Sequence, residues 1–378
     1  MLEIFLILLS FILLIFYLYF LWGILKGLKK LSCQKSDNLP EEFISIIIPF
    51  RNETKNILMS LKSIEGQNYP KDKFEVIYVN DNSEDDSLNK LINAKKSDNV
   101  NVISVPNELL SNAHKKKAVS YAIEKSKGEI IVTTDADCKH NSLWLKSLLQ
   151  TFEDETGFVS GPVEFIDEQG IFSKLQKLEF AGLIFAGAGL IGNGKPIICN
   201  AANLAYRKSL YEKVNGFKDH LNLSSGDDEL LMQKIWKETD FSIKFCLNKE
   251  AIVLTDANET VRKFYDQRKR WASKGLFYAD KILVVKLILI FLFYLSLLIL
   301  PIAAIAFSIN FLFLFIFNFL TKIIFEYKIM KKGTELLYGK DLLKYLFAAE
   351  VFQIPYIVLA GVAGLFGNYK WKGRKLKR

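Results

Sequence analysis

The sequence predicts a mixed α/β domain with a mostly parallel sheet, placed between apolar helices at both ends of the chain. Three observations support this fold class. Strand-length apolar runs alternate with helical patterns in the middle, long apolar segments occupy the ends, and basic residues gather beside those segments. Half of the 378 residues are hydrophobic, which excludes disorder as the main state, and 21 Gly, 8 Pro and 4 Cys exclude collagen-like and disulfide-scaffold proteins.

The N-terminal segment, residues 2–25, is almost uninterrupted in its apolar character and carries Glu3 as its only charge. At about 1.5 Å per residue, a helix of this length crosses the hydrocarbon core of a bilayer. No basic stretch precedes it and no small-residue cleavage pattern follows it, so we expect an anchor at residues 1–25 and not a signal peptide. The basic linker after it, residues 26–40, places the following chain in the cytoplasm by the positive-inside tendency, through Lys26, Lys29, Lys30 and Lys35.

The C-terminal region, residues 281–367, is expected to hold two to three transmembrane spans. Residues 282–325 are too long for one crossing and fit two, with a bend near Pro301 or Asn310. A cytoplasmic signature follows that block, formed by Lys322, Lys328, Lys331 and Lys332. A third apolar segment, residues 342–366, carries Lys344, Glu350 and Pro355 in its first part.

The basic tail, residues 368–378, creates a conflict in this topology. One anchor and three further crossings would put the tail outside, whereas its six basic residues favour the cytoplasm. Either one C-terminal segment lies in the interface or re-enters, or the charge rule fails here. In each case we expect a multi-pass integral protein of the cell (inner) membrane with a cytoplasmic middle domain.

The net charge of +9 comes from sequence next to the membrane segments. The tail supplies six basic residues and the linker four, with no acid in the tail or from Lys26 to Lys35, so the rest of the chain has a net charge of −1. Membrane lipids with anionic headgroups are therefore the expected partners, and nucleic acid is excluded. The cysteines have no metal-site spacing, and free thiols are expected in the cytoplasm.

The middle domain, residues 41–275, alternates strand and helix patterns, which is typical of βαβ units with a mostly parallel sheet. Expected strands cover residues 43–49, 74–79, 100–105 and 129–134, and expected helices cover 54–65, 85–95, 115–125 and 142–152. Ligands of such sheets bind beyond the carboxyl ends of the strands. A further apolar segment, residues 180–192, is too short to span a membrane and is expected to be a core or an interfacial helix.

Acids follow three of these strands, at Glu53, Asp81 and the Asp135-Ala136-Asp137 run. Residues i and i+2 of an extended segment point the same way, so Asp135 and Asp137 can face one hard divalent ion or the diphosphate attached to it. A turn or a helix cap is the alternative for any one acid pair. Helix capping is likewise the alternative for Asp227 and Asp228, and an interfacial aromatic-basic belt is the alternative for the group around Trp271.

Five motifs in order carry a resemblance to a known family. They are Ser45–Glu53, Val79–Ser83, Thr134–Asp137, Gly226–Asp228 and Gln267–Trp271. The sequence resembles the membrane-bound family 2 glycosyltransferases with a GT-A fold, which include polysaccharide synthases of the poly-N-acetylglucosamine type and ceramide glucosyltransferases. The resemblance covers residues 43–275 and implies a Rossmann-like GT-A catalytic domain.

The resemblance implies roles at the donor end of the cleft. Asp81 matches the acid that contacts the nucleotide base, flanked by Pro49, Arg51 and Glu53. Asp135 and Asp137 match the acids that bind the sugar nucleotide and Mg²⁺ or Mn²⁺, with Asp137 as the more direct metal ligand. Lys115 matches a lysine near the nucleotide, although His114 stands where the family usually has glycine, and Lys116 or Lys117 could take its place. Asn80 replaces the first acid of a common pair, which leaves the nucleotide preference open.

The resemblance also implies roles at the acceptor end. Asp228 matches the general base, next to Asp227 in the substrate site, and Gln267, Arg270 and Trp271 match the QxxRW motif at the acceptor and diphosphate end. Together these imply inverting transfer of a sugar from a nucleotide-diphosphate sugar to a membrane-associated acceptor, a lipid or a lipid-linked glycan. The alternatives are a processive polysaccharide synthase and, from another class, a catalytically silent membrane scaffold.

Overall fold

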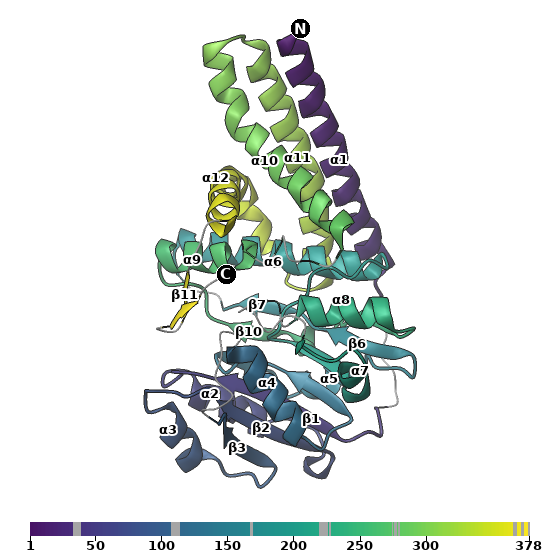
Figure 1. Cartoon of the computed structure of the whole chain (residues 1–378), viewed down its shortest axis with the longest axis vertical. Helices are drawn as coiled ribbons and strands as arrows, with labels where there is room; N and C mark the ends of the chain where they lie inside the picture. The colour runs from purple at the N-terminus through teal and green to yellow at the C-terminus, as the bar shows by residue number, and fades with distance from the viewer. Residues whose placement is uncertain are drawn as a thin grey trace.

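The computed structural model describes residues 1–32, 39–106, 114–166, 169–218, 226, 228–273, 275, 278 and 280–365, and the backbone of 369–371 and 374–376. An α/β domain occupies one end of the molecule and a group of long helices the other, as Figure 1 shows. The free thiols expected from the sequence are confirmed for Cys138, Cys199 and Cys246, while Cys33 lies outside the described residues.

The central sheet has seven strands in the order β3-β2-β1-β4-β8-β6-β9. Their bounds are Val100–Ser104, Phe74–Asn80, Ile44–Phe50, Ile130–Thr133, Leu204–Arg207, Thr156–Ser160 and Ser242–Phe245. Only β8 runs antiparallel to its neighbours, so the predicted mostly parallel sheet is confirmed. The chain builds β2 and β3 on one side of β1 and then places β4 on the other side, which makes the β1–β4 boundary the switch point where such sheets bind ligands.

The first four predicted strands and helices are confirmed within a few residues. The helices are α2 (Ile57–Glu65), α3 (Ser87–Ala94), α4 (His114–Lys125) and α5 (Trp144–Leu149). Strand β2 is buried along its whole length and β1 along nearly all of it, because helices cover both faces of a parallel sheet.

A second sheet of three strands links the central sheet to the helices that follow it. Its order is β5-β10-β7, with bounds Cys138–His140, Val253–Thr255 and Val163–Phe165. Strand β10 pairs with β5, so Thr255 lies opposite Cys138. The segment that connects Thr255 to α9 (Val261–Ala272) therefore begins near Asp137, the residue before Cys138. The remaining elements are α6 (Ile171–Gly192), α7 (Lys208–Lys213), α8 (Glu229–Glu238), 3₁₀ turns at Lys71–Lys73, Lys249–Ala251 and Lys340–Tyr345, and the strands β11 (Tyr369–Trp371) and β12 (Arg374–Leu376).

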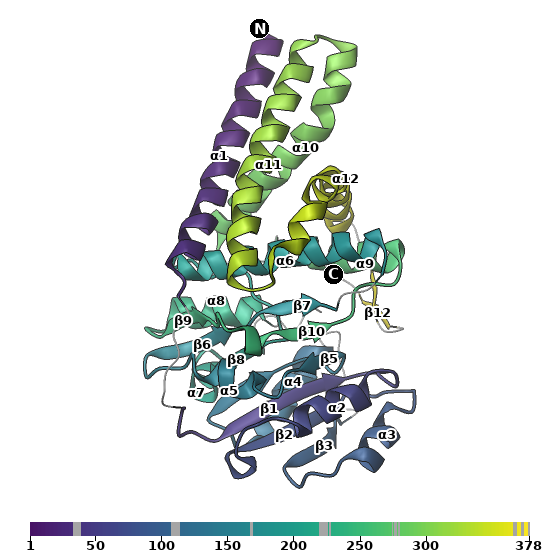
Figure 2. The same cartoon turned by 180° about the vertical axis from the view of Figure 1, so that it is seen from behind.

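Three long helices, α1 (Leu2–Lys30), α10 (Lys281–Ala306) and α11 (Asn310–Leu336), pack side by side. Helix α12 (Leu346–Leu365) instead runs across them and packs on α9 (Figures 1 and 2). The expected break in residues 282–325 falls just before Asn310, and Pro301 stays inside α10. Among the described residues, four helices are long and apolar enough to cross a membrane: Glu3–Lys30, Ile171–Gly192, Lys281–Ala306 and Lys340–Leu365.

Helix α6 corrects the expectation for residues 180–192. The helix begins at Ile171, so the argument that it is too short to span was wrong, and more than half of it is buried in the protein. It crosses α1 at glycines: a Cβ on Gly27 would lie 1.7 Å from the carbonyl oxygen of Gly189. The two backbones therefore touch, and this contact fixes the bundle to the α/β domain.

Lys322 corrects a second expectation. It was grouped with the lysines of a cytoplasmic signature, but its side chain is completely buried inside the helix group. Its ammonium lies 2.9 Å from Glu326 Oε1 and donates to Glu350 of α12 and to Gln353 Oε1, the latter at 2.9 Å. Tyr17 of α1 also donates to Glu326, at 2.5 Å. The position of α12 is thus tied to the bundle by buried charge.

Candidate active site

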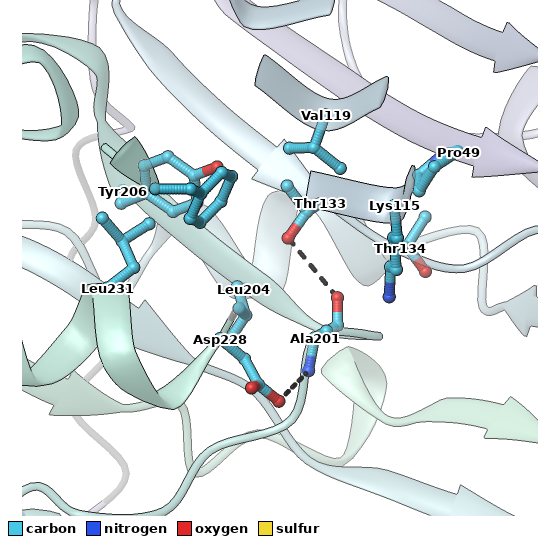
Figure 3. A pocket seen from close by; sticks show the side chains of 11 residues that line it. Pro49, Lys115, Val119, Thr133, Thr134, Ala201, Leu204, Tyr206, Asp228 and Leu231 are labelled. Carbon is cyan, nitrogen blue, oxygen red and sulfur yellow. Dashed lines mark hydrogen bonds between the residues drawn. The ribbon is translucent and has the colours of Figure 1, made fainter. Parts of the chain in front are cut away.

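A cleft lies at the switch point between β1 and β4. It holds about 290 Å³ of empty space, part of it open to solvent. Its lining comes from β1, β4, β8, α4 and α8 and from the loops beside them (Figure 3): Pro49, Lys115, Val119, Thr133, Thr134, Ala201, Leu204, Tyr206, Phe217, Asp228 and Leu231. Three residues predicted for the site, Pro49, Lys115 and Asp228, therefore share one cleft although they are far apart in the sequence.

The loops after β1 and β2 are joined into one unit by Arg51. Its guanidinium donates to the carbonyl oxygens of Asp81, at 3.0 Å, and Asn82, and lies 2.7 Å from Glu84 Oε1. Asn52 and Asn82 both have a φ of +52°, a left-handed conformation that asparagine tolerates better than most residues. Since Arg51 is only 4% exposed and its two Nη atoms bind residues 81, 82 and 84, it holds the Asp81 loop in place.

The two acids predicted for the base end of the cleft are both buried. Asp81 is 3% exposed, and its Oδ1 lies 3.8 Å from Nδ1 of His114. His114, which stands where the resemblance implies glycine, therefore lies beside Asp81. Glu53 is 7% exposed and accepts a hydrogen bond from Asn56 Nδ2 at 3.2 Å, which fixes it within its own turn.

The Asp135-Ala136-Asp137 run follows β4 and is met by α4. Lys115 Nζ lies 2.7 Å from Asp135 Oδ1, so Lys115 reaches this acid, while its neighbour Lys116 is buried. Cys138 Sγ lies 3.7 Å from Asp137 Oδ1, and burial together with the charges of the two aspartates raises the pKa of this thiol. Cys138 therefore stays protonated and donates toward Asp137.

His140 supports this run from behind. Its ring nitrogens lie 2.8 Å from Thr134 Oγ1 and 3.0 Å from Ser63 Oγ. Burial lowers the pKa of His140 to about 3, so the ring is neutral at physiological pH. The backbone on either side of Asp135 and Asp137 is therefore anchored to the core, while both carboxylates remain partly exposed.

These two carboxylates fit a divalent ion that is shared with a ligand. Over the part of the chain that the structure describes, no three His, Cys, Asp or Glu side chains gather as a metal site. Mg²⁺ and similar ions are commonly held by one or two carboxylates together with substrate phosphates and water. Asp135 and Asp137 offer that partial set of oxygen ligands.

Asp228 caps α8 and faces the cleft at the same time. Its Oδ1 accepts from the backbone N–H of Glu229 at 2.8 Å, and its Oδ2 accepts from that of Ala201 at 3.1 Å. Figure 3 shows the second contact next to the hydrogen bond from Thr133 Oγ1 to the Ala201 carbonyl. Helix capping, the alternative weighed from sequence, is therefore present, and it orients the carboxylate.

Asp227 lies outside the described residues. The neighbouring Glu229, which the sequence analysis did not select, is 6% exposed and accepts a hydrogen bond from Tyr278 at 2.6 Å. Burial, with the charge of Glu229, raises the pKa of Tyr278 well above its usual value. Glu229 could have been selected from the sequence as the third acid of the Asp-Asp-Glu run. No sequence spacing indicates that Tyr278 is its partner.

The QxxRW motif lies on α9, beyond the residues that line the cleft. Thr260 caps this helix by accepting from the backbone N–H of Lys263 at 3.2 Å. Gln267 accepts from Asn258 Nδ2 at 2.9 Å, and both Arg270 and Trp271 are partly exposed. Arg268, to which the sequence assigned no role within the motif, is the buried member of the motif region at 5% exposed.

Comparisons with known proteins identify the family of this chain. The sequence model described as Glycosyl transferase family 2 matches residues 45–214, and the one described as Glycosyl transferase family group 2 matches residues 130–361. Glycosyltransferase AglE of Haloferax volcanii is 32% identical over 189 residues, which cover 49% of this chain. A hyaluronan synthase of Streptococcus pyogenes is 26% identical over 262 residues, which cover 65% of this chain. The matched parts span 59% of the length of each of these two relatives.

A solved structure shows the same fold over almost the whole chain. It is the mannosyltransferase PcManGT from Pyrobaculum calidifontis in complex with GDP-Man and Mn²⁺, with a TM-score of 0.57 and 18% identity, covering 95% of this chain and 97% of that one. The family resemblance, the GT-A-like fold and the expectation of an enzyme are thereby confirmed. The chain belongs to family 2 of the glycosyltransferases, enzymes that transfer a sugar from a nucleotide sugar.

Proposed function

We propose that this enzyme transfers a sugar, with inversion, from a nucleotide-diphosphate sugar to a lipid or lipid-linked glycan in the membrane. The observation that carries the proposal is the orientation of Asp228. Two backbone N–H groups hold its carboxylate in the cleft that Lys115 also lines, and Lys115 in turn contacts Asp135. A base and a donor-binding lysine in one cleft are what such a transfer requires.

At the donor end, Asp81 contacts the nucleotide base, with Pro49 and Glu53 beside it. Arg51 shapes this pocket indirectly, because its guanidinium binds the backbone of the Asp81 loop. Asp135 and Asp137 would hold Mg²⁺ or Mn²⁺ together with the donor diphosphate, with Asp137 expected as the more direct ligand. A bound divalent ion would neutralise charge that develops on the leaving diphosphate.

At the acceptor end, Asp228 takes the proton of the attacking hydroxyl. The hydroxyl oxygen forms a bond to the anomeric carbon while the bond from that carbon to the diphosphate oxygen breaks, which inverts the centre. General-base help of this kind is typically worth roughly 10²–10⁴-fold. Asp227 belongs to the same substrate site, and Gln267, Arg270 and Trp271 face the acceptor and the diphosphate.

For the membrane arrangement we propose three spans, α1, α10 and α11, with α12 lying in the cytoplasmic interface. Helix α11 is not one of the four helices that are apolar enough to cross by composition, but it packs side by side with α1 and α10, and two of its charges, Lys322 and Glu326, are paired inside the helix group. The exposed large side chains of α12 are apolar and suit contact with lipid: Phe347, Val351, Phe352, Leu359, Val362 and Leu365. The reason for placing this helix in the interface is its direction, since it runs across α1, α10 and α11 and packs on α9 (Figures 1 and 2). Three spans place the N-terminus outside, and the catalytic domain (41–275) and the basic tail (368–378) in the cytoplasm. This arrangement removes the conflict between the tail and the positive-inside tendency.

A processive polysaccharide synthase is the second candidate, favoured by the hyaluronan synthase among the relatives. Three spans in one chain leave little protein to line a channel for an exported polymer. The length of the product distinguishes the two, since a ladder of long polymer on a gel would favour the synthase.

The test uses the full chain in lipid nanodiscs that contain a total lipid extract. A panel of UDP-sugars and GDP-sugars is supplied, and release of the nucleoside diphosphate is followed. We expect Asp228→Asn to bind the accepted donor normally and to lose about 100-fold or more in turnover. Asp240→Asn, an exposed acid just beyond α8, is the matched control and should turn over normally. Retained turnover in Asp228→Asn would remove Asp228 from the role of base.

A further inference from the structure

A buried ion pair joins the QxxRW helix α9 to α6. Arg268 Nε donates to Glu179 Oε1 at 2.9 Å, and Nη2 donates to Oε2 of the same carboxylate. The side chains are only 4% and 10% exposed. The contact is bidentate, a geometry that arginine provides and lysine does not.

The same carboxylate also binds α12. Tyr356 donates to Glu179 Oε1 at 2.9 Å, and its ring packs on Phe264 of α9 with centroids 5.3 Å apart. Tyr265 of α9 donates to the carbonyl oxygen of Leu359, at 3.2 Å. Three helices therefore meet at one pair of charges, next to the proposed membrane surface.

The loop before α9 is held by the same helix, one turn away. Gln176 of α6 donates to the carbonyl oxygen of Asn258 at 2.9 Å and accepts from its backbone N–H at 3.0 Å. Asn258 Nδ2 then donates to Gln267 Oε1 at 2.9 Å. Gln176 and Glu179 lie three residues apart on one face of α6, and together they fix the start and the middle of α9.

Arg268 also fixes which way the amide of Gln267 points. A guanidinium only donates, so the atom of Gln267 that Arg268 Nη1 contacts must be the amide oxygen. The amide nitrogen lies on the other side of the same planar group and is left as the donating end. On the other side of Arg268, its guanidinium carbon lies 4.4 Å from the ring centre of Trp271.

We propose that Arg268, through its pair with Glu179, is a positioning residue for glycosyl transfer that presents the N–H groups of Gln267 and the ring of Trp271 to the acceptor. This inference rests on the proposed function. Arg268 does not touch the substrate in this role. It sets the direction in which Gln267 donates, which suits an oxygen of the acceptor or of the diphosphate.

Two variants separate positioning from simple packing. Arg268→Lys keeps the charge but lacks the planar fork that reaches Glu179 and Gln267 together. The double variant Glu179→Gln/Arg268→Met removes both charges, so no buried charge is left without a partner. Glu164→Gln/Lys177→Met is the matched control, because Lys177 also extends from α6 but pairs with Glu164 of β7, at 3.0 Å, and the double change again leaves neither charge of the pair behind.

Three measurements are made on the full chain in nanodiscs: binding of UDP and GDP with Mn²⁺, release of nucleoside diphosphate from the donor panel, and hydrogen exchange of residues 261–272. We expect both variants to bind nucleotide like the unaltered chain and to exchange faster in α9. Their turnover should fall roughly 10- to 100-fold, the scale of loss when reacting groups are misplaced by about 1 Å. The Glu164→Gln/Lys177→Met control should match the unaltered chain in all three measurements.

Normal turnover in the double variant would overturn the inference, since the pair would then serve packing alone. A loss of nucleotide binding that parallels the loss of turnover would overturn it as well. If the unaltered chain turned over no donor, the proposed function would fail. The exchange of α9 would still decide whether the pair holds this helix, and unchanged exchange would overturn the inference separately.

Discussion

Replacing Lys322 by methionine should destabilise the helix group strongly. The lysine is completely buried, and its ammonium contacts Glu326, Glu350 and Gln353. Methionine fills much of the same volume but supplies neither charge nor donors. The substitution therefore leaves two carboxylates close together, of which Glu350 is only 2% exposed.

The size of the effect follows from that burial. Removing one partner of a buried ion pair typically costs about 3–5 kcal/mol, because the remaining charge has lost its water and its counter-charge. The cost should lie at the lower end of this range where one carboxylate takes up a proton, because one of the two buried charges is then neutralised. At roughly 2–4 °C for each kcal/mol in domains of 150–250 residues, the midpoint of thermal unfolding should fall by about 6–20 °C.

The assay is thermal unfolding of the full chain in nanodiscs, followed by tryptophan fluorescence. The triple variant Lys322→Met/Glu326→Gln/Glu350→Gln leaves no charge behind and should regain most of the loss. Lys344→Met is the control: its partner Asp341 lies 2.8 Å away but the side chains are 72% and 96% exposed, so no change is expected. A Lys322→Met protein as stable as the unaltered chain would refute the reasoning.

Three further predictions concern other parts of the molecule. Gly27→Leu should separate α1 from α6 and lower the midpoint of thermal unfolding, because its Cβ would lie 1.7 Å from the Gly189 carbonyl oxygen. Gly23→Ala is the control and should be tolerated, because the nearest atom to its Cβ would be 3.5 Å away. The pKa of His140 is lowered to about 3 from an ordinary 6.5, so between these pH values the unfolded chain binds one more proton than the folded chain. The free energy of unfolding should therefore decrease as pH falls through that window, by about 1.4 kcal/mol per pH unit. Between pH 6.5 and pH 5, the stability of His140→Asn should fall less than that of the unaltered chain in the same unfolding assay. An equal fall in stability would contradict this. EDTA should stop the release of nucleoside diphosphate, and Mn²⁺ or Mg²⁺ should restore it. Asp137→Asn should need a much higher metal concentration for the same release. Turnover in the presence of EDTA would argue against a metal.

The sheet and the position of the cleft were predictable because both depend on local patterns. Apolar runs of strand length alternate with helices, and the carboxyl ends of parallel strands meet at one edge. Asp81 and Asp135 follow β2 and β4, so their common location required no knowledge of distant contacts. The contact between Lys115 and Asp135 also follows from topology, because α4 leads into β4.

The parts that the sequence did not predict depend on pairs of polar residues far apart in the chain. Polar residues in the first half of α6 interrupt its apolar pattern, so the sequence does not indicate where this helix begins. Two of them, Gln176 and Glu179, form hydrogen bonds with Asn258 and Arg268, more than 80 residues later. Lys322 was grouped with exposed lysines for the same reason, since its partner Glu350 lies in another helix. Periodicity identifies which residues are polar, but it does not identify which polar residues have buried partners.

The charges at the cleft also show why a cation belongs in the proposed reaction. Asp135 is matched by Lys115, Asp81 lies near His114, and Asp228 is held by backbone N–H groups. A nucleoside diphosphate would bring further negative charge to Asp135 and Asp137, and Coulomb repulsion at such short range is strong in a partly buried site. The single charge of Lys115 does not offset both these two acids and a diphosphate. A divalent ion between them would turn this repulsion into attraction, and that is the physical basis for expecting metal and donor to bind together.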